Sequence, residues 1–179
     1  PYFIENKGGW KYETGKSEIK VGVFDTGIRW QHEDLGDGSW SGSRVKGGWD
    51  YGKNVHPSSQ TNSDPINSSQ SNGHGTAVAG IIGAIRNNDT GIAGIAGGNF
   101  ENEYEEDGVS LYSLRTSTGT LELGDTLFSI TTSSEAIVEG SVYNPYTGFG
   151  FGLNIQNYSW RIINDHPDID TILHTLRNA

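Results

Sequence analysis

The sequence predicts an α/β fold in which a central, mostly parallel sheet is flanked by helices. Short apolar runs of strand length alternate with segments of helical periodicity, which is the order typical of α/β proteins. The run at 17–25 is almost continuously apolar, as in a strand that is buried on both faces. The 179 residues suffice for one domain with a substantial core, and no internal repeat or linker divides them.

Each element follows from a local pattern. Strands are expected at 17–25, at the short run GGWDY (47–51), at 107–114, and at 152–160 as a further buried strand. Shorter helices are expected over 133–140 and 168–176. The stretch from Leu35 to Asn72 is rich in Gly, Ser, Asn and Asp and lacks periodicity, so it is expected to be a long surface excursion.

A helix is expected to begin near His74. Its residues Val78, Ile81, Ile82 and Ile85 stand at i, i+3, i+4 and i+7, which places them on one face. The remaining positions are mostly Gly and Ala, so other elements can surround the helix closely.

Composition restricts the classes of partner. The chain has 22 acidic and 12 basic residues and a formal net charge of −10, which argues against nucleic acid and anionic membranes as partners. Calcium and basic substrates are compatible with that charge. The sequence has no cysteine, so disulfides and thiolate metal sites are excluded for these residues. It contains no apolar run long enough to span a membrane.

Two residues are candidates for catalysis. Asp25 ends the first predicted strand, and reactive groups in open α/β sheets gather at the carboxyl ends of the strands. His74 lies at the first turn of a helix that can pack on the same sheet. A carboxylate bonded to one imidazole nitrogen fixes the tautomer and leaves the other nitrogen to act as a base. The alternative is structural: Asp25 as a turn residue and His74 as a capping residue at a Gly-rich helix start.

The motifs around both residues resemble those of a known family. VGVFDTGIRWQHEDL (21–35) and NGHGTAVAGIIGA (72–84) are similar to the aspartate and histidine motifs of the subtilisin-like serine proteases, the subtilases. VSLYSLR (109–115) and LNIQNYSW (153–160) resemble two further strands of that family. The resemblance implies a subtilisin-like fold, incomplete in this chain, with Asp25 as the orienting residue and His74 as the general base.

The resemblance also shows what residues 1–179 do not contain. Subtilases carry their nucleophile in a Gly-Thr-Ser-x-Ala motif and an oxyanion asparagine in an Ala-Gly-Asn strand, and neither string occurs here. We therefore expect these residues alone to be inactive as a peptidase. Three explanations stay open: an enzyme whose serine is on a second chain, a fragment of a longer enzyme, and a catalytically inactive relative that binds or inhibits peptides.

Further assignments are implied by the resemblance alone. A peptide or protein substrate would pair with an edge at 117–124, which includes Gly119, and with the segment around Ser159 and Trp160. The loop at 84–97 resembles one that binds structural calcium, and an extracellular location is usual for the family. The implied calcium ligands are the Asp34 carboxylate, the Asn88 amide oxygen and the carbonyls of Arg86, Thr90 and Ile92. An ordinary Asx-rich turn is the alternative for that loop.

Overall fold

The computed structural model describes residues 8–51, 54, 56, 73–98, 107–116, 130–147, 150–159 and 174. The elements, in chain order, are η1 (Gly8–Lys11), β1 (Lys20–Asp25), η2 (Glu33–Leu35), β2 (Val45–Asp50), α1 (His74–Gly83), β3 (Ser110–Arg115), α2 (Ile130–Ser141) and β4 (Ile155–Asn157). Among these described elements, no helix combines the length and the apolar character that crossing a membrane requires.

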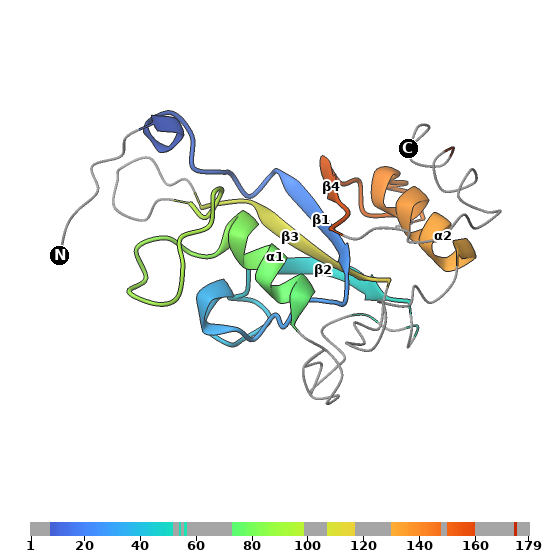
Figure 1. Ribbon diagram of the computed structural model, residues 1–179. Coiled ribbons are helices and arrows are strands. Elements are labelled where there is room, and N and C mark those ends of the chain that lie inside the picture. Colours follow the sequence, from blue (N-terminus) through green and yellow to red (C-terminus); the bar gives the residue numbers. More distant parts are fainter. Residues whose placement is uncertain are drawn as a thin grey trace.

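The four strands form one parallel sheet in the order β2-β3-β1-β4 (Figure 1). This confirms the predicted α/β class. β1 is an inner strand that pairs with β3 along its whole length and with β4 over three residues. Because all strands run in the same direction, their carboxyl ends meet at one edge of the sheet, and Asp25 lies at that edge.

Helices lie against both faces of the sheet, as predicted. On one face, α1 packs over β1 and β3, and the buried apolar residues there include Val21, Val23 and Leu111. On the other face, Ala136 of α2 packs with Phe24 and Leu114. Alternate residues of β1 thus enter two different clusters, which explains why that strand is nearly continuously apolar.

The prediction that the helix includes Ile85 is wrong. The helix ends at Gly83, so Ile85 lies outside it, and Ile81 is 56% exposed. The buried positions are instead the small residues Gly75, Ala79 and Gly83. A Cβ at Gly83 would lie 3.3 Å from Val109 Cγ2, so the absence of side chains lets the helix backbone lie directly on the sheet. Close approach of these small residues, together with the packing of Val78 and Ile82 on the core, defines the face that meets the sheet.

The prediction of a buried strand over 152–160 is also wrong. β4 has only three residues, Ile155–Asn157, and Ile155 is 52% exposed. Among the described strands β4 pairs with β1 alone, so its outer side has no neighbouring strand to bury it. The helix predicted over 168–176 lies outside the described residues except for His174.

Candidate active site

Asp25 is held at the end of β1 by the sheet and by a tight turn. Its side chain is buried, and its backbone carbonyl accepts a hydrogen bond from Thr116 N at 2.9 Å. Gly27, two residues later, has a φ of +97°, a left-handed conformation that glycine adopts without strain. The sequence Asp-Thr-Gly therefore ends the strand sharply and leaves the carboxylate facing the start of α1.

His74 is the first residue of α1, after Gly73 in a left-handed conformation with φ of 66°. The helix start has no side-chain hydrogen-bond cap, so His74 does not serve as one. The exposed fraction of its side chain is 40%, against 3% for Asp25. The start of α1 thus lies beside the Asp25 carboxylate.

The two candidate residues are in contact although 49 positions separate them. His74 Nδ1 lies 2.8 Å from Asp25 Oδ1 and 2.8 Å from Asp25 Oδ2. Asp25 Oδ1 also accepts a hydrogen bond from Thr26 N at 2.7 Å. With Nδ1 bonded to the carboxylate, Nε2 is the imidazole nitrogen that can exchange a proton with a substrate. This geometry is suited to a general base.

Two threonines that the sequence analysis did not single out join the motifs. Thr26 Oγ1 accepts a hydrogen bond from Gly75 N at 3.1 Å, and Thr76 Oγ1 accepts one from Arg29 N at 2.9 Å. Each hydroxyl thus binds a backbone N–H of the other motif. The signal in the sequence that could have indicated this reciprocal arrangement was a threonine shortly after each candidate residue, Thr26 after Asp25 and Thr76 after His74.

The predicted substrate residues are only partly described. Ser159 lies two residues beyond the carboxyl end of β4, and its Oγ donates to Asn157 Oδ1 at 2.7 Å. Asn157 is level with Val23 in the neighbouring strand, so Ser159 lies at the edge of the sheet where β1 ends. Trp160 and Gly119 lie outside the described residues.

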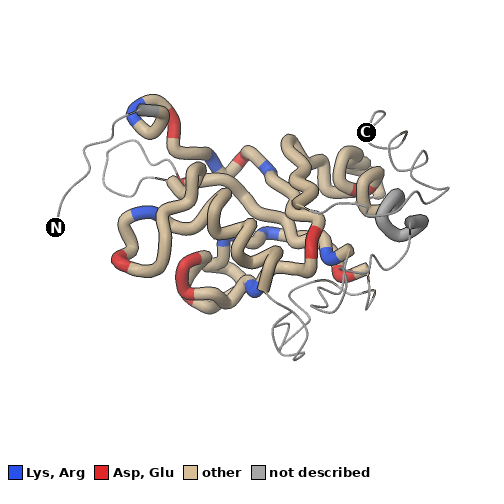
Figure 2. Tube along the Cα trace, in the orientation of Figure 1, with Lys and Arg blue, Asp and Glu red and all other residues tan. Residues whose placement is uncertain are grey.

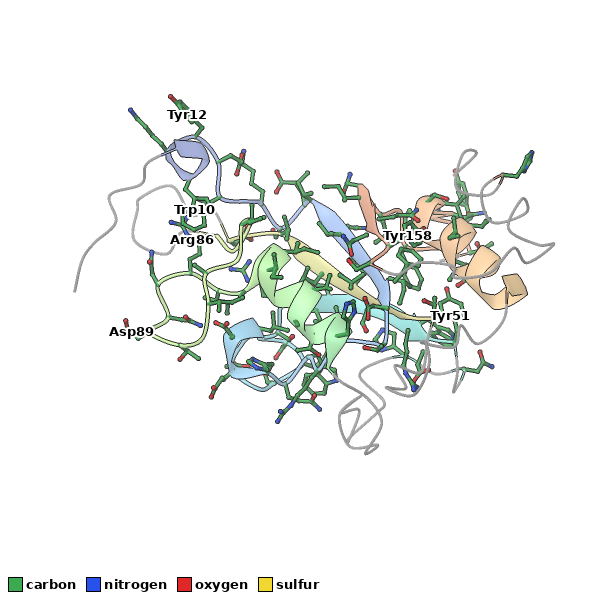
Figure 3. The ribbon with its side chains drawn as sticks, in the orientation of Figure 1. Trp10, Tyr12, Tyr51, Arg86, Asp89 and Tyr158 are labelled. Carbon is green, nitrogen blue, oxygen red and sulfur yellow. The ribbon has the colours of Figure 1, made fainter. Side chains whose placement is uncertain are left out.

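The predicted metal ligands come from two segments that the fold brings together. Asp34 is buried in η2; its Oδ1 accepts from Asn88 Nδ2 at 3.2 Å, and its Oδ2 accepts from Ile92 N at 2.8 Å. Thr90 belongs to the same loop, and its N–H donates to Asn88 Oδ1 at 3.2 Å. At the loop base the Arg86 guanidinium lies 4.3 Å from the ring centroid of Trp10 (Figure 3).

The donor set of this loop fits a hard cation. A buried carboxylate, an amide oxygen and backbone carbonyls are the ligands that calcium prefers. A Cβ at Gly91 would lie 2.2 Å from Asp34 Oδ2, so the backbone of the loop lies directly against the carboxylate. Within the described part of the chain, no group of three or more His, Cys, Asp or Glu side chains gathers. A cation here would therefore depend on Asp34 and on neutral oxygens.

Known proteins are similar to the part of the chain that holds this site. The profile of the Subtilase family matches residues 16–103. Thermitase of Thermoactinomyces vulgaris is 40% identical over 96 residues, which cover 54% of this chain and 28% of thermitase. The halolysin-like extracellular serine protease Nep of Natrialba magadii is 33% identical over 96 residues, 54% of this chain and 16% of that protein.

A third relative, the thermophilic serine proteinase of Bacillus sp. (strain AK1), is 40% identical over 87 residues, 49% of this chain and 18% of its own length. The chain thus spans less than a third of the length of the curated relatives it matches. The region matched by the family profile includes Asp25, His74, Asp34 and the loop from Arg86 to Ile92.

Proposed function

We propose that this chain, whose residues 16–103 match the profile of the Subtilase family, provides the aspartate and histidine of a serine endopeptidase. The observation that supports this most directly is the contact of both Asp25 carboxylate oxygens with His74 Nδ1 at 2.8 Å. The serine nucleophile and the oxyanion asparagine would come from residues outside 1–179.

In the proposed reaction, His74 Nε2 takes the proton of the serine hydroxyl while that oxygen attacks the scissile carbonyl. The same nitrogen then gives the proton to the leaving amine, and the acyl-enzyme that forms is hydrolysed by water. Asp25 keeps the imidazole in the required tautomer and stabilises the imidazolium that forms in each step. The hydrogen bond from Thr26 N to Asp25 Oδ1 fixes the carboxylate during this cycle.

The substrate would be an extended peptide that adds to the edge near Ser159. The position of Ser159 at the carboxyl edge of the sheet, close to the end of β1, supports this assignment. Trp160 and Gly119 remain proposed contacts by family resemblance. An extracellular location is supported by the name of the halolysin-like relative, which is an extracellular protease.

We also propose that calcium binds the loop around Asp34. The ligands would be the Asp34 carboxylate, the Asn88 amide oxygen and the carbonyls of Arg86, Thr90 and Ile92. The burial of the Asp34 carboxylate supports the proposal. To bind the cation through its oxygen, Asn88 would exchange its present Nδ2 contact with Asp34 Oδ1 for a contact through Oδ1. A bound cation would compensate the buried negative charge and join η2 to the end of α1.

The test uses the full natural polypeptide and a fluorophosphonate probe, which labels activated serines. We expect labelling and peptide hydrolysis, with kcat reduced by about 10⁶-fold in His74→Gln and by about 10⁴-fold in Asp25→Asn. The matched control is His174→Gln, which makes the same change at an exposed position and should leave kcat unchanged.

The alternative is a subtilase-like module that binds or inhibits peptides without hydrolysing them. No probe labelling of the natural polypeptide, together with retained peptide binding, would establish that alternative. It would also contradict the proposed peptidase.

A further inference from the structure

Three charged side chains, those of Asp25, Arg115 and Asp50, form a row across the sheet that begins at the Asp25–His74 pair. In the register of the sheet, Arg115 at the end of β3 is level with Asp25 on one neighbouring strand and with Asp50 on the other. Side chains that are level on adjacent parallel strands point to the same face, so all three lie on the face that α1 covers. Figure 2 shows acidic and basic positions side by side where these strands end.

Arg115 has a carboxylate on each side and pairs with Asp50. Its Nη1 donates to Asp50 Oδ1 at 3.2 Å and to Oδ2 at 2.9 Å. The exposed fractions of the two side chains are 20% for Arg115 and 4% for Asp50, so solvent screens this pair only weakly. Asp25, by contrast, directs its oxygens toward His74 Nδ1 and Thr26 N.

The arginine side chain already lies against the turn that carries Asp25. A Cβ at Gly27 would lie 3.3 Å from Arg115 Cδ and 3.5 Å from its Cγ, so the aliphatic stem runs along this turn. Neighbouring strands are about 4.8 Å apart, and a change of rotamer is enough to move a guanidinium between partners on either side. Arginine stays protonated and binds carboxylates strongly. Without Asp50, Asp25 is the nearest acidic side chain in the row.

We propose that Asp50 is a positioning residue that holds the Arg115 guanidinium away from Asp25. The carboxylate of Asp25 then accepts its hydrogen bond from His74 Nδ1 and not from arginine. The inference rests on the proposed function for its catalytic meaning, but the geometry it concerns is measurable without catalysis. Among the described residues, the charged group in contact with the His74 ring is Asp25 from β1, and Arg115 from β3 and Asp50 from β2 follow it in the row.

The direct test is proton NMR of the full natural polypeptide and its Asp50→Asn variant. A hydrogen bond from imidazole Nδ1–H to a carboxylate gives a low-field proton resonance, which is assigned here by its loss in His74→Gln. We expect this resonance to be lost in Asp50→Asn, because Arg115 moves to Asp25. It should return in Asp50→Asn/Arg115→Met, which lacks the competing charge. The matched control Asp37→Asn removes an exposed carboxylate and should leave the resonance unchanged.

Two results would overturn the proposal. One is a folded Asp50→Asn variant that keeps the resonance. The other is a folded Asp50→Asn/Arg115→Met variant that lacks the resonance. The charge of Arg115 is absent from this variant, so competition for Asp25 could not explain the loss, and the ion pair would act through packing alone. If circular dichroism shows that Asp50→Asn does not fold, the comparison is made between Asp50→Asn/Arg115→Lys and Asp50→Asn/Arg115→Met. Only the lysine variant should lose the resonance, and equal behaviour of the two contradicts the proposal.

Kinetic measurements distinguish the positioning role of Asp50 from the proposed peptidase function. In a natural polypeptide that hydrolyses peptides, kcat/KM should fall by a factor of about 10 to 100 in Asp50→Asn and recover in Asp50→Asn/Arg115→Met. A polypeptide without hydrolytic activity contradicts the proposed function, while the NMR comparison still decides whether Asp50 positions Arg115. An active polypeptide whose resonance and kcat/KM are both unaffected by Asp50→Asn contradicts the positioning role alone.

Discussion

Gly75, the residue after the candidate base, shows how a single missing side chain sets the geometry of this site. A Cβ at this position would lie 2.4 Å from Gly27 O and 3.1 Å from Asp25 Cβ. Because the nearest of these atoms is a backbone carbonyl oxygen, a change of side-chain rotamer cannot make room. The start of α1 can approach the end of β1 closely enough for the 2.8 Å contact only with glycine here.

Gly75→Ala should therefore destabilise the protein by about 1–3 kcal/mol through overpacking. The free energy of unfolding in urea is the measurement. Gly80→Ala is the matched control in the same helix, since its new Cβ would meet only Ile92 Cδ1 at 3.5 Å. That substitution should stabilise by up to about 1 kcal/mol through helix propensity. Equal effects of the two substitutions would contradict the close-approach argument.

Between elements, the reciprocal threonine bonds fix α1 relative to the turn after β1. Thr26 and Gly75 are both buried, so the Gly75 N–H depends on Thr26 Oγ1 for its hydrogen bond. Thr76 provides the second link through Arg29 N. Two such bonds beside the Asp25–His74 contact hold the helix start against the turn.

Thr26→Val keeps the shape of the side chain and removes the acceptor. We expect a loss of about 1–3 kcal/mol in the free energy of unfolding, because the buried Gly75 N–H is left without its partner. Amide hydrogen exchange gives the specific signal: protection of Gly75 N–H should fall in Thr26→Val. Thr26→Ser keeps Oγ and should keep that protection. Unchanged protection in Thr26→Val would show that the threonine bond does not hold the helix start.

Sequence periodicity was sufficient to predict one of these elements, β1, but not the buried face of another, α1. β1 was predictable because a strand between two packed faces must be apolar at nearly every position. The buried face of α1 was not, because hydrophobic periodicity gives weight to Ile81 and none to Gly83. The packing of a glycine and alanine face depends on how near the sheet lies, and this distance is a tertiary property.

For the whole molecule, the main electrostatic feature is an excess of acidic groups, with a formal net charge of −10. Self-repulsion at this charge opposes compaction, and a bound divalent cation would reduce it. The loop from Arg86 to Ile92 is connected to η2 through Asp34 and to η1 through the contact of Arg86 with Trp10. A cation held at Asp34 would thus stabilise several segments together.

Calcium should raise the thermal stability of the natural polypeptide, by about 2.7 kcal/mol at a concentration 100 times the dissociation constant. Asp34→Asn should abolish the calcium-dependent rise in Tm, because it removes the carboxylate ligand. The matched control is Asp89→Asn, at an exposed position of the same loop (Figure 3), which should keep the rise. A calcium response that Asp34→Asn leaves intact would place the cation elsewhere or leave only weak, nonspecific screening.

The sequence by itself determined the α/β class, the parallel direction of the strands, and the two motifs that place Asp25 and His74 at element ends. Those are local properties, since they follow from periodicity, turn chemistry and residue type. Tertiary structure alone decided the reciprocal threonine bonds, the buried face of α1 and the pairing of Arg115 with Asp50. Each of these depends on the distance and register between segments far apart in the chain, and no local pattern encodes that separation.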